Sequence, residues 1–140
     1  GMDAELKESV DQYVQSDHYG DAEKDGRAAA LQKVVGALAT GKAQLLDLVL
    51  YLEPALNDTS NPQGRRHSIQ LLADCLRDPA AEMRLNLKHV ETFVVFFCSK
   101  LCDWQCVEGS TTGLASMLRR QAPQLRTLKA SDGSPIVTDV

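Results

Sequence analysis

Apolar residues recur at spacings of three and four along most of the chain, and this period predicts helices. Within residues 4–18 the apolar stripe consists of Leu6, Val10, Tyr13 and Val14. A single apolar stripe on a polar helix indicates that the helix lies on a core. The polar segment Tyr19–Asp25 holds Gly20 and predicts a turn, after which Asp25 is expected to cap a second helix that ends at Thr40-Gly41.

Further helical segments follow. Leu45–Leu56 is apolar on nearly every side, which predicts a helix enclosed by neighbours, and Pro54 should kink this helix or end it early. The next helix is expected from about Gln63 to Leu76, ended by Arg77-Asp78-Pro79. Ala80–Asn86 is predicted to be a connector with at most a short helical turn.

Two more helices are expected towards the C-terminus. Leu87–Cys102 is the most apolar and should be the most buried. Trp104–Arg120 should be the last, with Pro123 ending it and Gly113 allowing a neighbouring helix to approach closely. Its predicted inner face consists of Val107, Leu114, Ala115 and Leu118.

The chain repeats itself. Leu45–Asp58 and Val90–Asp103 are of equal length, end in Leu-x-Asp and precede another helical stretch. In the first helices the aligned pairs are Leu45 with Val90, Leu48 with Phe93, Val49 with Val94, Leu52 with Phe97 and Leu56 with Leu101. In the second helices they are Leu72 with Leu114, Ala73 with Ala115 and Leu76 with Leu118. Such a repeat predicts an all-α solenoid (α-α superhelix) of about six helices, an architecture that binds partners.

The composition agrees with a mainly helical protein, since 44% of the residues are hydrophobic and only 5% are aromatic. The net charge of −4 disfavours direct binding of nucleic acid. Acidic residues gather near the start of the chain, a distribution more typical of a solvated face than of a steering surface. Neither a signal peptide nor a membrane-spanning stretch is recognisable, so we expect a soluble intracellular protein with reduced thiols.

Candidate chemistry is sparse. Cys98, Cys102 and Cys106 are spaced by four residues, but the Asp103-Trp104 turn should separate the third thiol from the other two, and no fourth ligand is near. Buried free cysteines are therefore favoured over a metal site. His18, His67 and His89 form no ligand pair, and no nucleophile motif or phosphate loop is present. We expect no enzyme activity, no metal and no cofactor.

Two further features have a structural and a functional interpretation. Trp104 is the sole tryptophan, and packing in the core or between repeats is favoured over a binding hot spot. Arg119 and Arg120 are expected to close a helix and complement its dipole.

Pro54, the turn residue Asp58, and Arg65 or Arg66 early in the second helix together resemble a HEAT repeat. In that family the aspartate and arginine tie adjacent repeats together. The second copy keeps Asp103 but has Val107 in place of arginine. The resemblance implies an N-terminal helical pair at 1–44, HEAT-like repeats at 45–77 and 78–120, and a polar tail at 121–140. There Ser134-Pro135 is expected to start a further repeat of a longer solenoid.

The succession VDQYV, LLDLVLYLEPALND, RRHSIQLLADCL and VETFVVFFCSKLCDWQCVEGSTTGLASML resembles the N-terminal domain of the MMS-nineteen family of nucleotide-excision-repair and transcription proteins. The resemblance covers roughly Ala4–Arg120. It implies an armadillo-like helical scaffold of the cytoplasm and nucleus. Members of that family serve the targeting complex of cytosolic iron–sulfur cluster assembly, whose clients include DNA helicases, and are tied to DNA repair and transcription through TFIIH.

We therefore expect a protein–protein interaction scaffold whose contacts lie on a groove or ridge of successive second helices. The candidate partner-binding residues are polar positions on or beside those helices, namely Arg65, Arg66, Gln70, Arg119 and Arg120. The expected partners are iron–sulfur targeting subunits and their apoprotein clients, with no nucleic acid or membrane. This chain alone is expected to be a monomer or a weak dimer. The alternatives are a small helical metal-binding domain or enzyme that uses the cysteines, and an oligomerisation module.

Overall fold

Helices form nearly all of the part of the chain that the computed structural model describes, which is residues 1–17, 21–82 and 85–125. No strand occurs in these ranges, so the all-α prediction is confirmed. The helices are α1 (Ala4–Gln15), α2 (Asp21–Thr40), α3 (Leu45–Leu56), α4 (Pro62–Arg77), the short α5 (Pro79–Glu82), α6 (Leu87–Lys100) and α7 (Val107–Leu125), with a 3-10 turn η1 (Trp104–Cys106) before α7.

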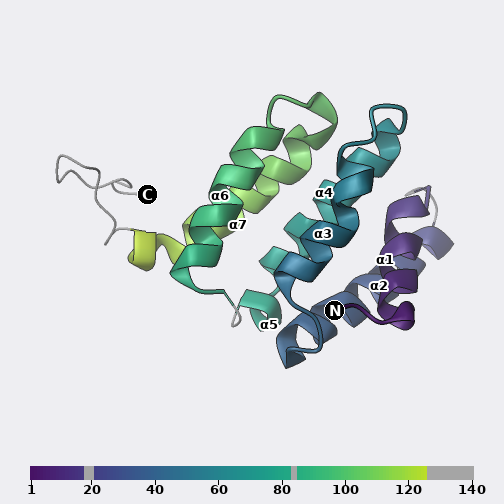
Figure 1. Cartoon of the computed structure of the whole chain (residues 1–140), viewed down its shortest axis with the longest axis horizontal. Helices are drawn as coiled ribbons and strands as arrows, with labels where there is room; N and C mark the ends of the chain where they lie inside the picture. Colours follow the sequence, from purple (N-terminus) through teal and green to yellow (C-terminus); the bar gives the residue numbers. More distant parts are fainter. Residues whose placement is uncertain (18–20, 83–84, 126–140) are drawn as a thin grey trace.

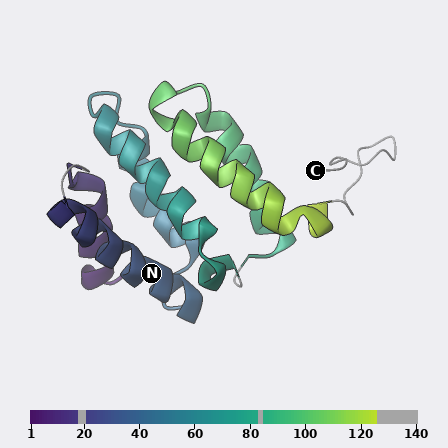
Figure 2. The same ribbon diagram turned by 180° about the vertical axis from the view of Figure 1, so that it is seen from behind.

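The helices are stacked in hairpins that form two layers. In Figure 1 the first helices of the hairpins, α1, α3 and α6, lie towards the viewer. Figure 2 shows the opposite side, where α2, α4 and α7 lie in front. α4 is the central helix and contacts α1, α2, α3 and α7. Its buried residues include Ile69, Leu71, Leu72 and Leu76, so the core lies around this helix, as expected of a stacked solenoid.

The first two helices differ from their predicted boundaries at the connection between them. α1 ends at Gln15, and its N-cap is Asp3, whose carboxylate accepts the Leu6 N–H at 2.8 Å. α2 begins at Asp21, so Asp25 lies inside the helix and the prediction that it caps α2 is wrong. The reason is local propensity, because Ala, Glu and Lys at 22–24 favour a helix and one glycine at 26 costs only about 1 kcal/mol. The predicted stop is confirmed at Gly41, which has a positive φ of 79°.

Pro54 lies inside α3, which continues to Leu56, so the prediction of an early end is wrong. A proline removes one helical N–H and crowds the carbonyl four residues earlier. That carbonyl belongs to Leu50, a residue exposed to solvent. Water can hydrate it there, which lowers the cost of the lost hydrogen bond.

The later helices start with strong capping signals. The Asn61 side chain accepts the Gly64 N–H at 2.9 Å, and Pro62 takes the first helical position of α4. The Asn86 side chain accepts the His89 N–H at 2.9 Å, while His89 Nδ1 accepts the Asn86 N–H at 3.3 Å. The short turn predicted in the connector is present as α5.

α7 is longer than predicted. It continues through Pro123 to Leu125, so the predicted end at about Arg120, with Pro123 as the stop, is wrong. A proline lacks one backbone N–H and therefore removes only one hydrogen bond from the last turn of α7, so the helix tolerates it there. The predicted start of a further repeat at Ser134-Pro135 lies outside the described residues.

The repeat alignment holds at the centre of the first helices. Leu45 and Val90, Leu48 and Phe93, and Leu52 and Phe97 are all buried. The last aligned pair breaks the match, because Leu56 is buried whereas Leu101 is exposed at 39%. The aligned positions Leu56 and Leu101 are therefore both apolar but differ in burial.

The inner face of α7 is also rotated from the prediction. Of the predicted residues, Leu114 and Leu118 are half-buried against the core, whereas Val107 and Ala115 are exposed. Gly113, Ser116 and Met117 are buried instead. α4 is covered from several sides, but α7 contacts mainly α4 and α6, so one flank of it faces solvent. The close approach expected at Gly113 is confirmed, because a Cβ there would lie 2.5 Å from Phe97 Cζ.

Among the described helices, none is both long enough and apolar enough to span a membrane.

Candidate functional site

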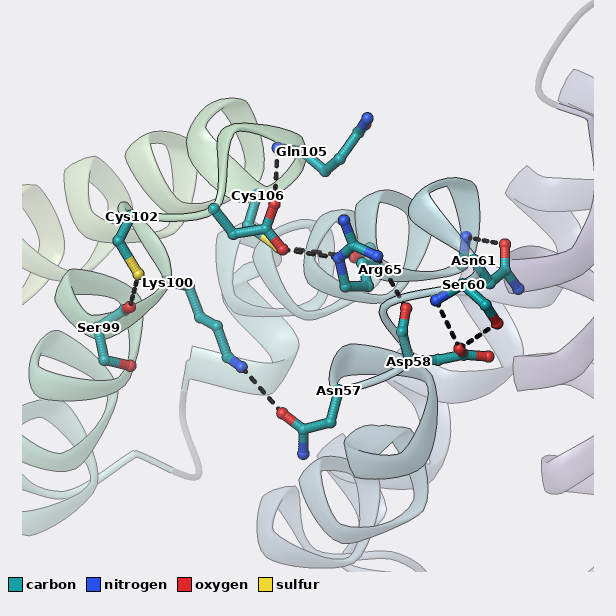
Figure 3. Close-up of polar contacts among 12 residues, drawn as sticks. Asn57, Asp58, Ser60, Asn61, Arg65, Ser99, Lys100, Cys102, Gln105 and Cys106 are labelled. Atoms are coloured by element: carbon teal, nitrogen blue, oxygen red, sulfur yellow. Dashed lines mark hydrogen bonds and ion pairs between the residues drawn. The ribbon is translucent and has the colours of Figure 1, made fainter.

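The two repeats are joined by an ion pair at their loop end. Arg65 at the start of α4 lies 2.7 Å through Nε from Asp103 Oδ2 in the turn after α6, and its Nη1 donates to the Asp58 carbonyl at 2.8 Å. Figure 3 shows the arginine between the two turns. The side chains are only 15% and 26% exposed. The arginine of the first repeat thus binds the aspartate of the second, which confirms the expected tie although Val107 replaces the second arginine.

Asp103 is held in its charged form. The hydrogen bond from Arg65 lowers the pKa of Asp103 below its ordinary value of 3.8, with a further contribution from the Gln105 N–H, while partial burial opposes the shift. When the pKa of a carboxylate is lower in the folded state than in the unfolded state, the ionised carboxylate stabilises the folded protein. This stabilisation is present at pH values above the unfolded-state pKa. The tie therefore depends on the ionised carboxylate.

This linkage makes stability depend on pH. We expect the free energy of unfolding to decrease as the pH falls below about 4, because the unfolded state binds a proton on Asp103 before the folded state does. Asp103→Asn should reduce the slope in that window and leave it unchanged above pH 5. Urea denaturation at a series of pH values measures both slopes, and identical slopes would contradict the assigned role of Asp103.

The other predicted partner-binding residues lie at separate places. Arg66 is 44% exposed on its side chain, and its Nη2 is 4.0 Å from Glu108 Oε2. Gln70 donates through Nε2 to Asp74 Oδ1 at 3.0 Å, and Asp74 Oδ2 also accepts the Tyr13 hydroxyl at 2.6 Å. Arg119 and Arg120 lie within α7, but their side chains are outside the described part of the structure. Arg65 and Gln70 are therefore engaged inside the protein, and Arg66 is the more available for a partner.

The second helices pack closely where the sequence predicted a groove or ridge. α4 and α7 are in contact, and a Cβ at Gly109 would come within 2.8 Å of Ile69 Cγ2. Glycine at this position lets the two backbones approach. The contact unites the repeats on this side of the protein (Figure 2).

The first helices instead leave a groove between them. It has a volume of about 440 Å³. Its apolar lining consists of Leu45, Leu46 and Val49 from α3 and Phe93 and Phe96 from α6, and its polar lining of Gln44, His89 and Thr92. The sequence signal for it was the apolar character of α3 on all sides, which we interpreted as enclosure. That interpretation is wrong, because Leu46 and Leu50 are 66% and 55% exposed.

Trp104 is exposed at 74%, so the predicted packing in the core or between repeats is wrong. It lies in η1, in the turn that joins α6 to α7 at one end of the hairpin. In the described structure no helix covers this end (Figure 1). Tryptophan is enriched at binding hot spots. An exposed Trp104 therefore favours the alternative interpretation, that it forms part of a binding surface.

The cysteines divide into two pairs. Cys75 and Cys106 are buried, whereas Cys98 and Cys102 are exposed, so the prediction of buried thiols holds only in part. Burial, with a further contribution from the neighbouring Asp103, raises the pKa of Cys106 to about 11, which keeps this thiol protonated and unreactive. Within the described ranges, no group of three or more His, Cys, Asp or Glu side chains is placed to hold a metal ion.

Comparison with known proteins gives one result. No curated protein and no solved structure matches the chain. A family model for the MMS19 N-terminal domain, described as Dos2-interacting transcription regulator of RNA-Pol-II, matches residues 49–137. The match begins within α3 and includes the rest of both helical repeats, with the Arg65–Asp103 tie between them. The chain therefore belongs to the family of Dos2-interacting transcription regulators of RNA polymerase II, the MMS19 N-terminal domain family.

Proposed function

We propose that this chain is a protein-recognition scaffold, the N-terminal part of a HEAT-repeat adaptor, and that it has no catalytic activity of its own. The main support for this proposal is a group of exposed apolar side chains on the layer of first helices. Leu46 and Leu50 on α3 and Val95 on α6 each expose more than half of their surface. Isolated exposed apolar residues are common, but several of them beside an apolar groove favour a protein interaction site.

The family supplies candidate partners. Its description names Dos2, and we propose a partner of that kind for this chain. We further propose that the chain serves the cytosolic iron–sulfur targeting complex and its DNA-repair and transcription clients, in the cytoplasm and nucleus. The proposal involves no cofactor bound by this chain, in agreement with the separation of exposed from buried thiols.

Binding measurements with purified proteins test the proposal. We expect saturable binding of the immobilised chain to Dos2 or to an iron–sulfur targeting subunit in biolayer interferometry. Introducing Leu46→Asp and Leu50→Asp together should weaken that binding at least about tenfold, because both side chains are exposed and form the proposed contact.

The matched control is a charge reversal on the opposite layer. Arg66→Glu alters an exposed side chain on α4 and should leave binding within about twofold of the unaltered chain if the first helices form the contact. Loss of binding in Arg66→Glu alone would place the contact on the second helices. Absence of saturable binding to every one of these proteins would contradict the proposed function.

A further inference from the structure

The groove between α3 and α6 has the shape of a helix-binding site. α3 and α6 have 12 and 14 residues and start at the same end of the groove, as Figure 1 shows. At 1.5 Å per residue they form walls of about 18–21 Å, the length of three to four helical turns. The apolar centre of the groove consists of Leu46, Val49, Phe93 and Phe96.

The walls also select the conformation of an occupant. Both are α-helices whose central N–H and C=O groups bond within the helix, so they offer no free backbone ladder to an extended peptide. A peptide that enters an apolar groove must therefore form its backbone hydrogen bonds within itself. An amphipathic helix does so and presents residues at i, i+3, i+4 and i+7 to the groove.

The charges around the groove favour an acidic occupant. Among the residues that the structure describes, no carboxylate lines it. Near one end the Lys100 ammonium is 3.5 Å from Asn57 Oδ1 (Figure 3) and 5.9 Å from the centre of the Phe96 ring. Among the described residues, Lys100 has no carboxylate within ion-pair distance. At the other end the N-terminus of α6 carries partial positive charge. The N-terminus of α3 is occupied by the Asp47 carboxylate, which accepts the Gln44 N–H at 3.0 Å.

We propose that this groove binds an acidic amphipathic helix of a partner protein, with its apolar face on Val49, Phe93 and Phe96 and a carboxylate paired with Lys100. The inference rests on the proposed scaffold function and specifies its ligand. Burial of the apolar face supplies most of the affinity, and the carboxylate at Lys100 fixes orientation and partner choice.

A peptide selection tests the occupant directly. A displayed library of randomised 14-residue peptides with helix-favouring backgrounds is selected on the whole chain, and enriched peptides are measured by fluorescence polarisation. We expect apolar residues at i, i+3 or i+4 and i+7, together with Asp or Glu. Leu46→Asp should weaken binding at least about tenfold.

Two matched controls locate the site. Val107→Asp places the same charge on an exposed apolar position of α7, in the other layer, that does not line the groove, and it should leave affinity unchanged. Lys100→Gln should weaken the binding of acidic peptides and flatten its salt dependence, whereas Lys33→Gln, which alters an exposed lysine on α2 in the other layer, should do neither. Circular dichroism of each variant confirms folding, which these exposed positions should tolerate.

Several outcomes would overturn the inference. Recovery of no peptide, or equal affinity for the Leu46→Asp variant, would exclude the groove as the site. Enriched peptides without acidic residues, or insensitive to Lys100→Gln, would exclude the acidic occupant. Binding of Dos2 or a targeting subunit that survives Leu46→Asp would leave the scaffold function in place while removing the groove from it.

Discussion

Phe97→Ala is expected to lower the free energy of unfolding by about 3–5 kcal/mol, the usual cost of truncating a buried phenylalanine. Phe97 is fully buried on α6, with ring centres 5.5 Å from Phe96 and 6.1 Å from Phe93. Its ring also lies directly against Gly113 of α7. Because two helices are closely packed around the ring, neither can move in to fill the cavity without breaking other contacts. Guanidinium denaturation followed by circular dichroism measures the loss.

The neighbouring position Val95 provides the control for Phe97. Val95 lies on the same helix but is 69% exposed, so Val95→Ala should change stability by no more than about 0.5 kcal/mol. A loss below about 1 kcal/mol for Phe97→Ala would mean that α6 and α7 do not pack around this ring.

Removal of the inter-repeat tie is the second large effect. Arg65→Ala is expected to destabilise the chain by about 1.5–3 kcal/mol, because it removes a charge-assisted hydrogen bond to Asp103 and leaves that partly buried carboxylate without its partner. It also removes the bond from Nη1 to the Asp58 carbonyl. Urea denaturation of Arg65→Ala, Asp103→Ala and the double variant separates the pairwise term from the rest.

The adjacent arginine again offers a matched control. Arg66 is exposed and 4.0 Å from Glu108, so Arg66→Ala should cost no more than about 1 kcal/mol. If the losses from Arg65→Ala and Asp103→Ala simply add in the double variant, the pair does not join the repeats energetically.

The periodicity of the chain predicted the helices well, yet it placed several boundaries wrongly. The start of α2 and the end of α7 differ from the prediction, because the polar segment with Gly20 predicts a turn and Pro123 predicts a helix end. Local signals of this kind compete with propensity and with packing, and α3 likewise continues through Pro54. The repeat alignment, by contrast, rested on many positions at once and identified the central buried pairs such as Leu52 and Phe97.

The candidate site was predicted less well than the fold. The pairing of an arginine with an aspartate was expected from the resemblance to HEAT repeats, and the structure assigns it to Arg65 and Asp103. The groove on the first helices was missed. Leu46 and Leu50 have the composition of core residues, and nothing in a single sequence distinguishes an apolar side chain that is covered by a neighbour from one that is left for a partner.

The amino-acid sequence was sufficient to predict the helical class, the two-helix repeat and its buried seam, because a period of 3.6 and the spacing of apolar residues are local properties of the chain. The tertiary structure alone decided which apolar faces meet another helix. α4 and α7 approach closely through Gly109, whereas α3 and α6 leave a groove between them. Exposure of Trp104 and division of the cysteines into buried and exposed pairs were decided in the same way. Burial depends on which elements surround a residue, and that arrangement is set by contacts between segments far apart in the sequence.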